Sequence, residues 1–123
     1  MVQETYLDTY ALVEISLGNP KFTVLQESPF VIHELTLVEF YTVILRKYNR
    51  ITADYWVRKL YPYTQNCDLS LLIKAAIFKV ENSNKDFSFF DAIGYIFARE
   101  NDLTFVTGDE EFRGFKGVEL IKK

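Results

Sequence analysis

Short apolar runs alternate with helix-like patterns along most of the chain, and this alternation restricts the folds open to it. We predict strands at residues 4–7, 30–32, 103–106 and 118–121, with a weaker strand between 63 and 67. Between them, apolar residues recur at three- and four-residue spacing, which predicts helices at 9–17, 36–48, 51–60, 69–80 and 87–100 and a helical turn at 110–112. Strands that are separated by helices pair in parallel through crossovers. We therefore expect a three-layer α/β/α sandwich with a mostly parallel sheet of about five strands.

The composition is typical of a single domain, which we expect to span residues 1–123. Apolar residues make up 49% of the chain and aromatic residues 16%, so the chain can bury a core without disulfides. No apolar run is long enough to cross a bilayer, and the first residues lack the basic-then-apolar pattern of a signal peptide. The single cysteine, Cys67, fits a buried thiol in a reducing compartment, so we expect a cytoplasmic protein.

Charge and histidine content narrow the chemistry. A net charge of −3 argues against broad nonspecific binding to nucleic acid. It leaves open a nuclease whose acids hold divalent cations, because the metal reverses the local charge. Since His33 is the only histidine, zinc sites built from several histidines are excluded, and a Ser-His-Asp triad is disfavoured.

Four acidic residues fall where strands end or helices begin. Asp8 and Asp109 directly follow predicted strands, and Asp109 opens the helical turn. Glu39 and Asp91 are expected in the first turns of the helices at 36–48 and 87–100. In parallel α/β sheets the functional site lies beyond the carboxyl ends of the strands. The positions of the four acids therefore predict that they gather at that edge.

Helix capping is the simpler explanation for each acid taken alone. Asp8 and Asp109 could be N-caps, since Asp is among the preferred residues there. Two Ser/Thr-x-x-acid pairs, Thr36 with Glu39 and Ser88 with Asp91, match the capping-box pattern. Glu14 is best explained as a surface acid, with support of Asp8 as the alternative.

Capping explains the four acids less well as a set. Glu39 and Asp91 have apolar neighbours, and no cation lies three or four residues from either. Carboxylates in apolar surroundings need partners or take up protons, and four that converge repel one another. A divalent cation would resolve both problems. Carboxylate oxygens suit Mg²⁺ or Mn²⁺, so we expect one of these ions as the cofactor.

At these residues the sequence resembles the PIN-domain family of metal-dependent ribonucleases and, within it, the VapC-type toxins of an archaeal-like subgroup. The similar segments are "YLDTYALVEI", "LTLVEFY" and "FSFFDAIGYIFARENDLTFVTGDEEF". They contain Asp8, Glu39, Asp91 and Asp109. The resemblance extends over about residues 5–121, and the third segment is its most specific part. Glu111 stands where many relatives have Asp, which leaves its role open.

The resemblance implies an endoribonuclease that hydrolyses RNA phosphodiester bonds with Mg²⁺ or Mn²⁺ held by those four carboxylates. Thr9, Thr107 and Glu111 would support them, although helix-start hydroxyls explain the two threonines equally well. We expect Arg113 to contact an RNA phosphate, and we interpret most other cations as solvated. The resemblance further implies a homodimer and a small VapB-type antitoxin protein that covers the acidic site. The aromatic-rich segment 41–63 could supply either interface.

Three alternatives remain. The first is an α/β domain that uses Mg²⁺ to act on a phosphorylated small molecule, but the chain lacks a glycine-rich phosphate loop. The second is an inactive PIN-like module that only binds a partner protein, which the four intact acids argue against. The third is an RNA-processing nuclease that is not a toxin. The sequence does not distinguish this last alternative from a toxin.

Overall fold

The computed structural model describes residues 4–123, so the first three residues of the expected domain lie outside it. Its five strands form one sheet in the order β3-β2-β1-β4-β5, and every neighbouring pair is parallel. The strands are β1 (Thr5–Leu7), β2 (Phe30–His33), β3 (Thr64–Gln65), β4 (Thr104–Thr107) and β5 (Val118–Leu120). The expected parallel sheet is confirmed, and it includes the weak strand in the middle of the chain.

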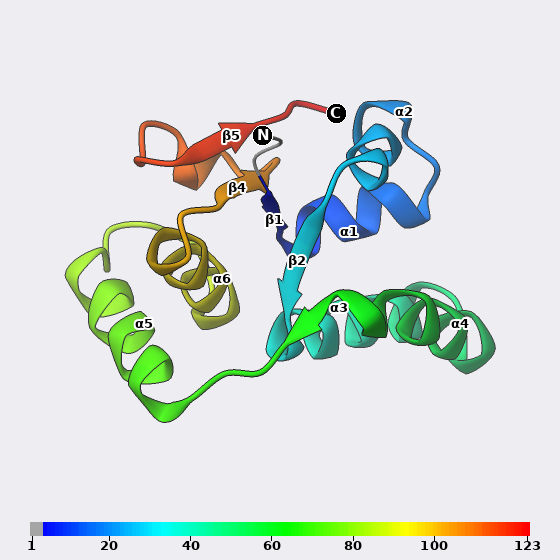
Figure 1. Ribbon diagram of the computed structural model, residues 1–123, viewed down its shortest axis with the longest axis horizontal. Coiled ribbons are helices and arrows are strands. Elements are labelled where there is room, and N and C mark those ends of the chain that lie inside the picture. The colour runs from blue at the N-terminus through cyan, green and yellow to red at the C-terminus, as the bar shows by residue number, and fades with distance from the viewer. Residues whose placement is uncertain (1–3) are drawn as a thin grey trace.

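Helices cover both faces of this sheet, with α5 and α6 on one side and α1, α3 and α4 on the other (Figure 1). The α-helices are α1 (Thr9–Ser16), α2 (Pro20–Thr23), α3 (Glu34–Lys47), α4 (Arg50–Leu60), α5 (Leu69–Glu81) and α6 (Phe89–Glu100). Single 3₁₀ turns are η1 (Val24–Glu27), η2 (Tyr61–Tyr63) and η3 (Glu110–Phe112). The fold is therefore the expected three-layer α/β/α sandwich.

The strands alternate their side chains between two apolar cores, as a period of two requires. Tyr6 and Phe105 pack against α5 and α6, while Leu7 and Val106, one residue further on, pack against the opposite helices. Burial on both faces explains why these strands read as short continuous apolar runs in the sequence.

Two predictions about local structure are wrong. Helix α3 begins at Glu34 rather than Thr36, and the N-cap is His33, whose Nδ1 accepts a hydrogen bond from the Leu35 N–H at 3.1 Å. Glu39 is therefore the sixth residue of the helix and not part of a capping box with Thr36. The second error is the helix α2, which the sequence did not predict. The Gly-Asn-Pro stop after α1 also starts α2, because the Asn19 side chain caps it and Pro20 occupies its first turn.

The exposure of Cys67 and the lengths of the helices bear on two other expectations. Cys67 is half-buried and so does not match the predicted buried thiol. None of the helices within residues 4–123 combines the length and apolar character needed to cross a membrane.

Candidate functional site

A pocket of about 470 Å³ lies where β1 and β4 end, and it brings four separate segments together. These are the start of α1, the middle of α3, the start of α6 and the loop after β4. The lining residues are Asp8, Thr9, Tyr10, Val38, Glu39, Thr42, Val43, Arg46, Phe90, Asp91 and Asp109. All four acids that the sequence singled out therefore line the same pocket.

Asp8 is the most buried of the four acids, with 3% of its surface exposed. It caps α1, because its Oδ1 accepts a hydrogen bond from the Ala11 N–H at 2.8 Å. Burial raises the pKa of Asp8 to about 8, and the nearby charges of Asp91 and Asp109 add to that rise. The Thr107 hydroxyl opposes it by stabilising the carboxylate. The predicted cap is thus confirmed, but it leaves an acid buried among other acids.

Asp91 begins α6 in the predicted capping box with Ser88. The Ser88 N–H donates to Asp91 Oδ2 at 2.8 Å, and the Asp91 N–H donates to Ser88 Oγ at 3.1 Å. Burial raises the pKa of Asp91 above its usual range despite these bonds, and the charge of Asp109 contributes. A local cap and a place in the acidic pocket are therefore compatible in one residue.

Glu39 projects into the pocket from α3 and caps no helix. Its carboxylate accepts a hydrogen bond from the Thr9 hydroxyl, which comes from the first turn of α1. Burial raises the pKa of Glu39, and the charge of Asp91 adds to the effect. Thr9 therefore links two of the segments that form the pocket.

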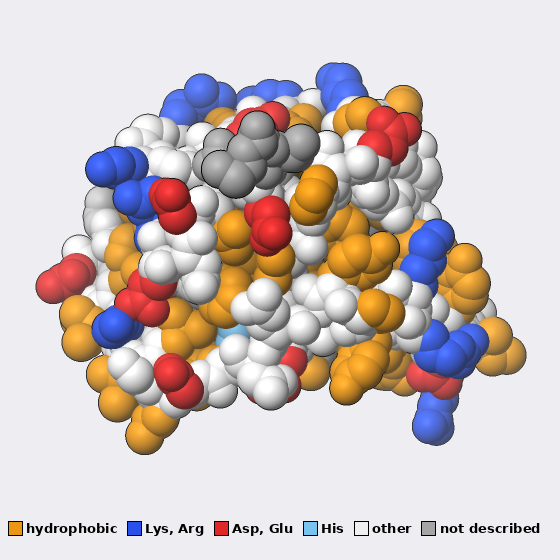
Figure 2. Space-filling model, viewed as in Figure 1, with side chains coloured by type: hydrophobic (Ala, Val, Ile, Leu, Met, Phe, Trp, Pro, Cys, Tyr) orange, Lys and Arg blue, Asp and Glu red, His pale blue; other side chains and the backbone are white. Residues whose placement is uncertain are grey.

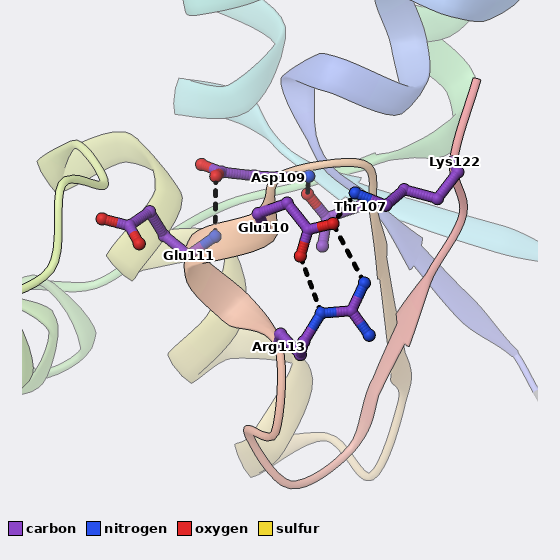
Figure 3. A network of polar contacts seen from close by, with 6 residues as sticks. All are labelled: Thr107, Asp109, Glu110, Glu111, Arg113 and Lys122. Carbon is purple, nitrogen blue, oxygen red and sulfur yellow. Dashed lines mark hydrogen bonds and ion pairs between the residues drawn. The ribbon is translucent and has the colours of Figure 1, made fainter.

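Asp109 follows β4 and caps η3, as its Oδ1 accepts from the Glu111 N–H at 3.0 Å. Its own N–H donates to the buried Thr107 Oγ1 at 3.0 Å, which fixes the turn that carries it (Figure 3). Thr107 therefore contacts the loop of Asp109 and also stabilises the carboxylate of Asp8. A hydroxyl that served only the start of a helix would not also have to stabilise the carboxylate of Asp8.

The remaining predicted residues, Glu111 and Arg113, do not line the pocket. Glu111 Oε1 accepts from the Asp86 N–H at 2.6 Å and so holds the loop that precedes α6. Arg113 donates to both oxygens of Glu110, at 2.7 and 2.9 Å, and Lys122 also contacts that carboxylate. Figure 3 shows Glu110 and Arg113 directed away from Asp109.

Arg46 lines the pocket instead of Arg113, although the sequence alone does not distinguish it from the cations on solvated helix faces. A signal for it was present, because Arg46 lies seven residues after Glu39 and so on the same helical face. Glu14 also differs from its prediction as a surface acid. It is buried, with its Oε1 accepting from Asn19 Nδ2 at 3.0 Å, and it does not line the pocket.

The donor set suits a hard divalent cation. Asp8, Asp91 and Asp109 each use one carboxylate oxygen for a backbone N–H, which leaves the other oxygen for a ligand. Burial is the largest cause of the raised pKa values of Asp8, Glu39 and Asp91, and the charges of neighbouring carboxylates add to it. In this conformation, no three His, Cys, Asp or Glu side chains within residues 4–123 are close enough together to coordinate one metal ion. Binding an ion would therefore require the carboxylates to rotate toward one another.

Several solved structures share this architecture. A toxin–antitoxin complex from Klebsiella pneumoniae matches with a TM-score of 0.78 and 18% identity, covering 97% of this chain and 99% of that chain. VapC20 from Mycobacterium tuberculosis, a sarcin-ricin loop cleaving toxin, matches at 0.77 and 17%, covering 93% and 98%. DNA-bound VapBC from Salmonella typhimurium matches at 0.72 and 16%, covering 99% and 98%. No protein-family model and no curated protein sequence matches the chain. The likeness to these structures is one of fold.

Proposed function

We propose that this protein, which has the PIN-like fold of the VapC toxins, is a metal-dependent endoribonuclease and the toxin of a VapBC-type pair. The observation that carries the proposal is the meeting of four acids from four separate segments in one pocket at the carboxyl edge of the sheet. The solved toxin with the same fold that cleaves the sarcin-ricin loop supports RNA as the substrate.

Asp8, Glu39, Asp91 and Asp109 would hold Mg²⁺ or Mn²⁺, directly or through water. The ion would supply positive charge to polarise a phosphodiester and to lower the pKa of a bound water. The protein's own part is to fix the carboxylates before the substrate arrives. The Thr9 hydroxyl orients Glu39, and Thr107 holds the turn that carries Asp109. Asp8 is buried, which limits the screening of its charge by bulk water.

Protons and metal compete for this site. Asp8, Glu39 and Asp91 all have pKa values raised by burial, so the empty pocket retains protons that a cation must displace. Metal affinity should therefore increase as the pH rises toward 8.

A homodimer is part of the proposal. One face of α5 carries four exposed apolar side chains at three- and four-residue spacing: Leu69, Ile73, Ile77 and Val80. Contiguous exposed apolar surface of this kind is typical of protein interfaces. Light scattering should give about twice the 14.4 kDa chain mass, and the double substitution Ile73→Lys with Ile77→Lys should halve it. A monomeric parent at high concentration would remove this part of the proposal.

The second proposed partner is a VapB-type antitoxin that covers the site. A small apolar hollow of about 230 Å³, lined by Leu37, Val38, Tyr41 and Val57, adjoins the acidic pocket, since Val38 lines both. The toxin–antitoxin complex among the similar folds supports such a partner. Co-expression with the antitoxin should yield a stable complex in which RNA cleavage is blocked.

The decisive experiment measures cleavage of structured and unstructured RNA by the purified protein with Mg²⁺, Mn²⁺ or EDTA. We expect cleavage with either ion, none with EDTA, and a rate lowered by on the order of a hundredfold or more in Asp109→Asn. Induced expression of the parent, but not of Asp109→Asn, should arrest bacterial growth if the nuclease is a toxin. Absence of cleavage with both ions, together with no Mn²⁺ binding at millimolar concentration by calorimetry, would refute the proposal.

A further inference from the structure

The acidic pocket has a second end of different chemistry. Its wall along α3 consists of Val38, Thr42, Val43 and Arg46, which we call the α3 wall. Among the residues that line the pocket, Arg46 is the one that carries a positive charge. The pocket therefore has a strongly negative end, a mostly apolar wall along α3, and a positive charge at the far end of that wall.

The distance between these ends is set by the helix. Glu39 and Arg46 are seven residues apart on one helical face, which corresponds to about 10 Å at a rise of 1.5 Å per residue. No ion pair joins Glu39 and Arg46 among residues 4–123. A ligand that interacts with both must be extended, with one negative group at the carboxylates and a second further along α3.

Arg46 is also free to bind such a group. Its side chain is exposed, and no carboxylate within residues 4–123 lies at ion-pairing distance from it. Two other arginines differ in this respect, since Arg50 pairs with Asp54 at 3.7 Å and Arg113 with Glu110 at 2.7 Å. An unpaired guanidinium presents a planar set of donors that matches the oxygens of a phosphate.

Positive charge continues beyond Arg46. Lys47 ends α3 and Arg50 begins α4, and both are exposed, although Asp54 offsets part of the charge of Arg50. Figure 2 shows Lys and Arg side chains gathered at the right of the molecule, at the end where α3 and α4 meet in Figure 1. The surface along α3 thus changes from acidic, through apolar, to basic.

We propose that Arg46 binds a phosphate next to the one that is cut, so that the RNA strand leaves the acidic pocket along α3 toward Lys47 and Arg50. The inference rests on the proposed nuclease function and adds a path for the substrate to it. The apolar α3 wall lies between the two phosphate positions, where it faces the sugar or base. A single strand fits this arrangement, because its bases are free to contact such a surface.

The test compares Arg46→Gln with Arg58→Gln, which removes the same charge from an exposed position on α4 outside the pocket. We expect Arg46→Gln to raise the KM for a single-stranded RNA roughly tenfold with less change in kcat. RNA binding by Asp109→Asn, measured by fluorescence anisotropy at several salt concentrations, should weaken when Arg46→Gln is added. The slope of log K against log salt should become shallower by about 0.7, the value for one phosphate contact on a single strand. Arg58→Gln should leave KM and slope unchanged.

Two further measurements separate the possible failures. Mn²⁺ binding and the melting temperature should be the same in the parent and Arg46→Gln, and Arg46→Lys should retain part of the RNA affinity. If the parent cleaves RNA but Arg46→Gln and Arg58→Gln behave alike, the substrate path is wrong and the nuclease function stands. A loss of Mn²⁺ binding or of stability in Arg46→Gln would assign Arg46 a structural role and overturn the inference. If the parent does not cleave RNA with either ion, the proposed function itself fails.

Discussion

Asp8 and Asp68 have the same local role at the starts of two helices but very different surroundings. Asp8 caps α1 by accepting from the Ala11 N–H at 2.8 Å, and Asp68 caps α5 by accepting from the Leu71 N–H at 2.9 Å. Asp68 is exposed, whereas Asp8 is almost completely buried. An exposed Asp therefore caps a helix with the same geometry, so capping does not require the burial seen at Asp8.

Burying the charged carboxylate of Asp8 costs free energy, and the hydrogen bond from the Ala11 N–H does not fully offset it. Burial raises the pKa of Asp8 to about 8, and the neighbouring charges of Asp91 and Asp109 raise it further. Strongly perturbed acids that gather in a cleft are typical of functional sites. The contrast between the two caps indicates that the position of Asp8 is set by the pocket.

The largest expected difference between the two residues is in activity. Asn caps helices nearly as well as Asp but lacks the negative charge that a hard cation requires. Asp8→Asn should therefore lower the initial rate of RNA cleavage with Mg²⁺ by on the order of a hundredfold or more. Asp68→Asn should cleave at the parental rate. We expect Asp91→Asn, Asp109→Asn and Glu39→Gln to behave like Asp8→Asn. Equal rates for Asp8→Asn, Asp109→Asn and the parent would mean that the carboxylates are structural.

The next largest difference is in how stability depends on pH without metal. The folded-state pKa of Asp8 is raised from 3.8 to about 8, so between these values the folded protein binds more protons than the unfolded chain. The free energy of unfolding should therefore fall as the pH rises from about 4 to 8 and level off above that. Urea titrations in EDTA should show a flatter pH dependence for Asp8→Asn and a parental one for Asp68→Asn. If Asp8→Asn retains the parental slope, the burial argument is incorrect.

Bound metal should restore part of the stability that the protein loses as the pH rises. Millimolar Mn²⁺ should raise the melting temperature of the parent by several degrees near neutral pH, because it binds the folded state alone. The shift should shrink in acid as the carboxylates take up protons. Scanning calorimetry should find it abolished in Asp8→Asn and preserved in Asp68→Asn. A similar shift in all three proteins would place the Mn²⁺ somewhere other than the pocket.

Local patterns in the sequence predicted much of this, because strand ends and helix starts depend on neighbouring residues. The four acids were found from their position after strands and near helix starts, and the fold brings them into one pocket. Patterns could not show which side chains from distant elements meet. The sequence indicates a surface acid at Glu14, yet this residue is buried and accepts a hydrogen bond from Asn19. Arg113 lies four residues after Asp109 in sequence but pairs with Glu110, while the more distant Arg46 lines the pocket.

The smallest effect concerns the value of the cap itself, and Asp68 isolates it because this residue lies outside the acidic pocket. Asp68→Ala removes the acceptor for the Leu71 N–H and should lower the free energy of unfolding by about 1 kcal/mol, whereas Asp68→Asn should change it by only a few tenths. Both variants should cleave RNA at the parental rate, since neither alters the pocket. Urea denaturation and cleavage assays on the same preparations would check this. If Asp68→Ala lost activity in proportion to Asp8→Asn, loss of helix capping would be sufficient to inactivate the protein, and the contrast between the two aspartates would no longer support a metal site.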